Sequence, residues 1–200
     1  FLRMSAMLGQ PDWFGLIFAF MLLLLTLDYR FDRIDLPRYL LIFAATAGVI
    51  LTRRWYLYFV VGYCFAYVLL LVVSSVRLAK SGQQSRAVHR LVRLAVFGLC
   101  AAGAMVLLLL PMVRKILGFD YAGRYSYYNF GGITLELAAQ TLRIGLLNFI
   151  LIGLGLWFAA KRRLPALPCL AGVELLVSLV LFTRVQNTGS HQMLLFVPGW

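Results

Sequence analysis

A short polar segment near the carboxyl end of the chain concentrates the side chains best suited to chemistry. It covers residues 184–192, Arg-Val-Gln-Asn-Thr-Gly-Ser-His-Gln, and lies between two apolar runs. Arg184 can offer a bidentate fork to a phosphate, and His191 can carry or share a proton. The amide side chains, which suit sugar hydroxyls, belong to Gln186, Asn187 and Gln192. The segment indicates either a substrate site or a solvated turn whose arginine extends to the membrane surface.

Two further features place charge in apolar surroundings. Arg53 and Arg54 stand between two apolar runs, so their guanidinium groups must reach lipid headgroups or a bound phosphate. Glu174 lies about ten residues from either end of the run from Leu164 to Thr183, which places a carboxylate near the middle of a span. Such a group indicates either a hydrogen bond between helices, made by a protonated carboxyl, or a pathway for a substrate or proton.

The longest connection between apolar runs extends from Arg114 to Arg143. Its stretch 119–132 is rich in tyrosine and glycine, and residues 133–143 have the pattern of a short amphipathic helix. Tyrosine rings suit the headgroup level of a membrane and can also stack on sugars. Asp120 is considered as a catalytic base, against the simpler interpretation of an interfacial aromatic belt.

Composition indicates which solvent these segments face. Hydrophobic residues make up 62% of the 200 positions and charged residues 13%, against roughly 45–50% and about 25% in an ordinary soluble domain. A soluble fold could not bury this much apolar surface. The 19 Lys and Arg against 7 Asp and Glu give a net charge of +12, but the cations occur in small groups between apolar runs. That distribution favours membrane loops and excludes a nucleic-acid-binding face.

Six apolar runs approach the roughly 20 residues that a helix needs to cross a bilayer. These runs lack the alternation of barrel strands, and a helix satisfies its own backbone in lipid. The sequence therefore predicts an all-α polytopic transmembrane helical bundle of about six to seven spans, with an outer amphipathic helix. The runs are Trp13 to Leu27, Tyr39 to Leu51, Trp55 to Val76, Leu94 to Val113, Ile144 to Ala160 and Leu164 to Thr183, with a seventh beginning at Leu194.

Alternating the connections between the two membrane sides gives an orientation. The side that includes residues 28–38 and the dense loop from Arg77 to Arg93 has more Lys and Arg, so we expect it to face the cytoplasm. On the cytoplasmic side, Asp28, Asp32 and Asp35 are expected to balance the neighbouring arginines. Arg53, Arg54, the long connection and residues 184–192 are then expected to meet at the outer face.

We expect one transmembrane domain over residues 1–200, a fragment of a longer chain, because it opens at Phe1 and closes on an apolar stretch. Cys64, Cys100 and Cys169 lie inside apolar runs without metal-ligand spacing, so they indicate neither disulfides nor a zinc site. No cofactor is identified; a divalent metal is possible but not indicated. Nucleotide-binding and hydrolase motifs do not occur in the sequence.

Two stretches together resemble a known group of enzymes. Tyr-Ser-Tyr-Tyr-Asn-Phe-Gly-Gly at 125–132, before an amphipathic helix, and Phe-Thr-Arg-Val-Gln-Asn-Thr-Gly-Ser-His-Gln-Met at 182–193 are similar to bacterial GT-C superfamily glycosyltransferases. The resemblance implies a multi-pass protein of the bacterial plasma membrane that moves a sugar from a polyprenyl-phosphate donor to an acceptor at the outer face. It implies an acidic general base in the first outer loop, which no segment here matches. Only substrate binding is carried over, to Arg184, Gln186, Asn187, His191 and Gln192.

Two other functions remain open from the sequence. One is a transporter or lipid flippase in which Glu174 couples transport and a helix broken near Pro165 and Pro168 acts as a gate. The other is a noncatalytic membrane scaffold.

Overall fold

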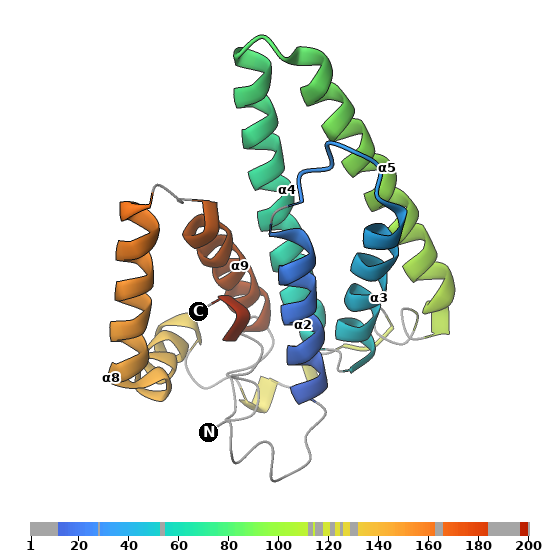
Figure 1. Ribbon diagram of the computed structural model, residues 1–200. Coiled ribbons are helices and arrows are strands. Elements are labelled where there is room, and N and C mark those ends of the chain that lie inside the picture. The colour runs from blue at the N-terminus through green and yellow to red at the C-terminus, as the bar shows by residue number, and fades with distance from the viewer. Residues whose placement is uncertain are drawn as a thin grey trace.

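The computed structural model describes residues 12–27, 29–52, 55–111, 114, 118–120, 123–124, 126–128, 132–162, 166–183 and 197–199. Within these ranges every regular element is a helix (Figure 1). Each of the six apolar runs forms a helix, which confirms the helical class. The helices are α2 (Asp12–Thr26), α3 (Leu36–Thr52), α4 (Tyr56–Lys80), α5 (Gln84–Leu108), α8 (Gly132–Lys161) and α9 (Ala166–Thr183), with short 3-10 turns η1 (Ser126–Tyr128) and η3 (Val197–Gly199).

Helices α4 and α5 extend well beyond the apolar runs that predict them. Each has 25 residues, and they are joined by a turn in which Gly82 has a φ of 88°. The expected loop from Arg77 to Arg93 is therefore mostly helix. Arg, Leu, Ala and Lys all favour helix. The polar residues beside each apolar run therefore limit the part that suits a membrane, but the helix continues through them. At about 1.5 Å per residue each helix is about 37 Å long, which exceeds the hydrocarbon layer of about 30 Å.

Two of the described helices, α4 and α5, are long and apolar enough to cross a membrane. The bent helix α8 would be a third if its two parts form one span. Helices α2 and α3 and the stretch Pro168–Thr183 of α9 are apolar but shorter. The fold is thus an all-helical bundle with two or three candidate membrane spans, and an integral membrane location is consistent with it.

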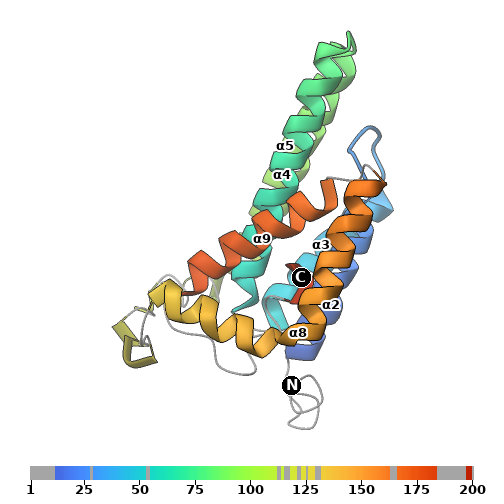
Figure 2. The same cartoon turned by 90° about the vertical axis from the view of Figure 1, so that its left-hand side faces the viewer.

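The helix ends gather at two levels, one at each end of the bundle. The α2–α3 loop and the α4–α5 turn lie toward one end, here called the loop end, together with the carboxyl end of α8 (Figures 1 and 2). The opposite end, here called the base, has the start of α4 and the ends of α3, α5 and α9. The described helix ends thus lie at two levels, one at each end of the bundle.

Helix α8 is sharply bent. Gly145 has φ 76° and ψ 155°, outside the helical region, and the parts Thr134–Arg143 and Gly145–Lys161 meet at 94°. Glycine suits this position because a side chain is strained at positive φ. The first part lies across the base of the bundle (Figure 2). The amphipathic stretch predicted at 133–143 is therefore a separate helical arm, turned away from the apolar part that follows.

Candidate functional site

The side chains singled out for substrate binding lie outside the described residues. These are Arg53, Arg54, Arg184, Gln186, Asn187, His191 and Gln192. Trp55, which follows Arg54, and Thr183, which precedes Arg184, are described, and the two helix ends to which they belong meet at the base. The rings of Trp55 and Phe182 have centroids 5.4 Å apart, and those of Tyr58 and Phe182 are 5.9 Å apart. Two helix ends that are more than 120 positions apart in sequence are thus in direct contact.

Asp120 has a local structural contact. Its side chain is exposed, and its Oδ1 accepts a hydrogen bond of 2.9 Å from the backbone N–H of Gly123. A carboxylate that caps a turn in this way is common in loops and needs no catalytic explanation.

A different carboxylate of the same stretch is enclosed. Glu136, on the helical arm of α8, is 1% exposed. The sequence pattern does not predict this enclosure, because an amphipathic pattern indicates which residues share a face but not what covers that face. Of the two carboxylates of this connection, Glu136 is buried and Asp120 is exposed.

Glu174 is enclosed between α9 and α4. It is 1% exposed, and its Oε1 lies 2.6 Å from Ser178 Oγ, one turn later on the same helix. Ser178 Oγ also lies 3.2 Å from the backbone oxygen of Tyr58 on α4. Glu174 Oε2 has no hydrogen-bond partner among the described residues. The group therefore joins two helices through Ser178, as expected for a polar contact between helices.

Close packing of α4 on α9 surrounds this contact. A Cβ atom on Gly62 of α4 would lie 2.8 Å from both the backbone oxygen of Glu174 and Ser178 Oγ. Only a residue without a side chain permits this approach. Hence Glu174 lies in a closely packed interface, and it is not among the residues that line the apolar cavity described below.

An ionic cluster joins the α2–α3 loop to α5. Asp32 Oδ1 accepts hydrogen bonds from Arg90 Nε and Nη2 at 2.8 and 2.7 Å, and Arg86 lies 3.2 Å from Oδ2. Arg93 donates to the backbone oxygen of Asp32. Charge compensation was expected within the loop; instead Asp32 is paired with arginines about 55 positions away. The prediction that residues 28–38 and 77–93 share one end is confirmed by these bonds.

Aromatic side chains hold the loop beneath this cluster. Phe31, at a φ of 56°, is 1% exposed and packs against Tyr39 and Phe97 with ring centroids 5.5 and 5.6 Å apart. The Tyr67 hydroxyl donates to the Tyr29 backbone oxygen at 2.5 Å. Burial raises the pKa of the Tyr29 hydroxyl, so this group stays protonated and donates to the backbone oxygen of Arg33 at 2.7 Å.

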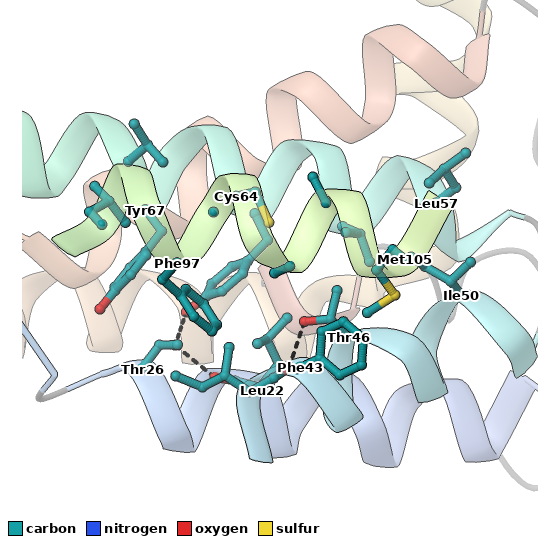
Figure 3. Close-up of a pocket in the computed structure, with 18 of the residues that line it drawn as sticks. Leu22, Thr26, Phe43, Thr46, Ile50, Leu57, Cys64, Tyr67, Phe97 and Met105 are labelled. Carbon is teal, nitrogen blue, oxygen red and sulfur yellow. Dashed lines mark hydrogen bonds between the residues drawn. The ribbon is translucent and has the colours of Figure 1, made fainter. Parts of the chain in front are cut away.

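A cavity of about 560 Å³ lies between α2, α3, α4 and α5, below the aromatic residues (Figure 3). Tyr67 and Phe97 mark one end of it, and Ile50 and Met105 lie toward the other. Its walls are almost entirely apolar. The cavity could not be predicted from the sequence, because apolar periodicity does not distinguish a side chain that packs on a neighbour from one that faces a gap.

The chain matches no protein-family model, no curated protein and no solved structure. Within the described ranges, no three His, Cys, Asp or Glu side chains are grouped so that they could hold a metal ion. The function must therefore be argued from the base, the cavity and the ionic cluster.

Proposed function

We propose that this chain is the membrane part of a glycosyltransferase that moves a sugar from a polyprenyl-phosphate donor to an acceptor at the outer membrane face. In this proposal the chain is a multi-pass protein of the bacterial plasma membrane, with six to seven spans, of which the shorter helices are tilted or extended by neighbouring residues. The helical arm of α8 lies in the outer interface, and the loop end faces the cytoplasm.

The single observation that carries the proposal is the contact between Trp55 and Phe182 at the base. Arg54 directly precedes Trp55 in sequence, and Arg184 follows Phe182 by two residues. The ring centroids lie 5.4 Å apart, and we propose that both arginines bind one phosphate group beside this contact. A diphosphate or phosphate ester held there would be bound by charge-assisted hydrogen bonds.

The chemistry expected at this place is an inverting displacement. An acceptor hydroxyl attacks the anomeric carbon, the bond from that carbon to the phosphate oxygen breaks, and a base takes the hydroxyl proton. Arg184 would stabilise the charge that develops on the departing phosphate. Gln186, Asn187 and Gln192 would orient sugar hydroxyls, and His191 would share a proton with the phosphate or the acceptor.

The test is sugar transfer in liposomes that contain the protein and radiolabelled polyprenyl-phosphate hexoses. Arg184→Ala and His191→Ala should each reduce transfer by about 10- to 100-fold, the loss expected when a hydrogen bond to a charged group is removed. Matched controls are Arg162→Ala and His89→Ala; both residues are exposed, one directly after α8 and the other near the start of α5. Full transfer in both Arg184→Ala and His191→Ala, with normal insertion and folding, would refute the proposed site.

A second comparison addresses the general base, the group that takes the proton. If the buried carboxyl of Glu136 is the general base, Glu136→Gln should reduce transfer strongly, whereas Asp120→Asn should leave it nearly unchanged. The opposite order would assign the role to Asp120. Retained transfer in both variants would exclude both carboxylates.

The alternative function is a transporter or lipid flippase, and the unpartnered Oε2 of buried Glu174 is the observation that favours it. Glu174→Gln should then stop flux of labelled lipid across the vesicle membrane. On the glycosyltransferase proposal the same variant should retain sugar transfer, because the amide can preserve the contact with Ser178. A protein that shows neither transfer nor flux would be a scaffold.

A further inference from the structure

The cavity between α2, α3, α4 and α5 has hydroxyl groups in its walls, yet they are already used. Thr26 Oγ1 donates to the Leu22 backbone oxygen at 2.7 Å, and the Tyr63 hydroxyl is hydrogen-bonded to Thr26. Thr46 Oγ1 donates to the Ile42 backbone oxygen at 2.7 Å, and the Tyr67 hydroxyl donates to the α2–α3 loop. A buried water needs two to four polar partners, so this cavity favours an apolar occupant.

Small residues on α5 create the space. A Cβ atom on Gly98 would have no neighbour within 4 Å, and Ala101 and Ala102 line the same wall. Protein interiors are close-packed, and an apolar gap forfeits the dispersion contacts of its walls. The volume of about 560 Å³ is in the range of ligand sites, roughly 300–1,000 Å³.

The shape of the cavity suits a hydrocarbon chain. Its lining on α5 extends from Leu94 to Leu109, about 22 Å along a helix that rises about 1.5 Å per residue. The buried residues of α5 are Ala87 and Arg90, both near its start, so its apolar part is at most partly covered by the rest of the described chain. A lipid in the surrounding bilayer therefore has access to this side of the bundle.

Excess positive charge lies at the loop end of the cavity. Phe31 lines the cavity, and its backbone oxygen lies 3.5 Å from Arg93 Nη1. Next to it, the Asp32 carboxylate accepts hydrogen bonds from Arg86 and Arg90, whereas Arg93 donates to the Asp32 backbone oxygen. Arg90 has a side chain that is 8% exposed, and it donates to Asp32 and Ser74, so it is enclosed within the cluster. Arg93 and Arg86 are less enclosed, and among the described residues each has N–H groups without a partner, since a guanidinium has five.

We propose that the cavity binds one hydrocarbon chain of an anionic membrane phospholipid, whose headgroup phosphate is bound by Arg93 and Arg86. Arginine suits this role because its planar donors match phosphate oxygens. This site lies at the loop end, away from the sugar-transfer site proposed at the base. The bound lipid would attach the α2–α3 loop and α5 to the lipid leaflet, and its hydrocarbon chain would fill the apolar cavity.

Native mass spectrometry of the purified protein, titrated with phosphatidylglycerol and phosphatidylcholine, tests the site. The wild type should retain one phosphatidylglycerol in preference to phosphatidylcholine. Gly98→Leu fills the cavity and should reduce retention of both lipids about tenfold, whereas Arg93→Gln should abolish the preference but preserve chain binding. Leucine favours helix over glycine, so the first variant should fold.

The matched controls are Gly103→Leu on α5, also with open space around it but not on the cavity wall, and exposed Arg77→Gln on α4. Both should retain phosphatidylglycerol as the wild type does. Equal losses in Gly98→Leu and Gly103→Leu, or an unchanged preference in Arg93→Gln, would overturn the proposal. So would selective retention of undecaprenyl phosphate over phosphatidylglycerol, which would assign the cavity to a polyprenyl lipid instead.

Discussion

Helix α4 has a closed side and an open side. Toward α9 it approaches so closely that Gly62 has no room for a methyl group, and the backbone of Glu174 fills the space. Toward α5 the two helices leave an apolar cavity of about 560 Å³, and Gly98 has nothing within 4 Å. Glycine thus permits close contact between α4 and α9, but leaves a gap between α4 and α5.

The difference teaches how polar groups are distributed in this bundle. On the closed side, Ser178 and Glu174 lie inside the packed interface and join the helices directly. On the open side, polar contact occurs at the loop end, where Arg90 bonds Ser74 of α4 and Asp32 of the loop. Between α4 and α9, polar groups therefore lie inside the packed interface, whereas the polar contact between α4 and α5 lies near the loop end.

The largest effect is expected from removing that contact. Asp32→Ala leaves the buried guanidinium of Arg90 without its carboxylate, and we expect a loss of about 2–3 kcal/mol in the free energy of unfolding. This is below the about 3–5 kcal/mol typical of fully buried pairs, because Asp32 is partly exposed. Denaturant unfolding in detergent micelles measures it.

Two variants check the cause of that loss. Adding Arg90→Met to Asp32→Ala should recover much of the stability, because it removes the unpaired charge. Arg86→Ala alone should change stability by less than about 1 kcal/mol, since the Arg86 side chain is 57% exposed. A double variant as unstable as Asp32→Ala would show that Asp32 acts by holding the loop and not by balancing Arg90.

A smaller loss is expected from Gly62→Ala on the closed side. The added methyl meets a backbone oxygen and Ser178 Oγ at 2.8 Å, so the helices must separate, at a cost of about 1–3 kcal/mol for overpacking. Gly103→Ala is the control, because its Cβ meets nothing. Equal stabilities for the two variants would mean that α4 and α9 are not tightly packed.

Ser178→Ala should reduce stability by about 1 kcal/mol, because it removes one buried hydrogen-bonding group from the same interface. Unfolding of the variant and wild type under identical detergent conditions measures this. In a Glu174→Gln background, Ser178→Ala should still reduce stability, but by less if Ser178 mainly bonds the Glu174 carboxyl. Full additivity would indicate that Tyr58 is the main partner.

The smallest effect, and the only gain, is expected from Gly98→Ala on the open side. Alanine favours helix over glycine by about 1 kcal/mol, and the cavity accepts a methyl group without strain. Stability should rise by up to that amount in the same unfolding assay. A loss instead of a gain would mean that α5 approaches α3 more closely than the open cavity allows.

Much of the fold follows from hydropathy along the sequence. Each of the six apolar runs became a helix, because a long apolar stretch without alternation has one good backbone conformation in lipid. The ends were less predictable. Helix α5 begins at Gln84, ten residues before its apolar run, because helix propensity continues where hydropathy falls. The bend at Gly145 was expected only as a boundary between two helices.

The sequence predicted the kinds of residue in the candidate site, but not the partners that surround them. Sequence indicated that Glu174 is a polar group among apolar ones, and the structure confirmed that it is enclosed. The partners of Asp32 could not be read from sequence, since several arginines at the loop end were equally available. Arg184 and His191, outside the described residues, stay predictions.

By itself, the sequence determined that the chain forms apolar helices and that the α2–α3 and α4–α5 connections lie at one end, because both follow from residue type and order. Tertiary structure alone decided that Gly62 closes an interface while Gly98 faces a cavity, that Arg90 pairs with Asp32, and that Trp55 touches Phe182. These are distances between segments far apart in the chain. They depend on how helices pack, which no local pattern encodes.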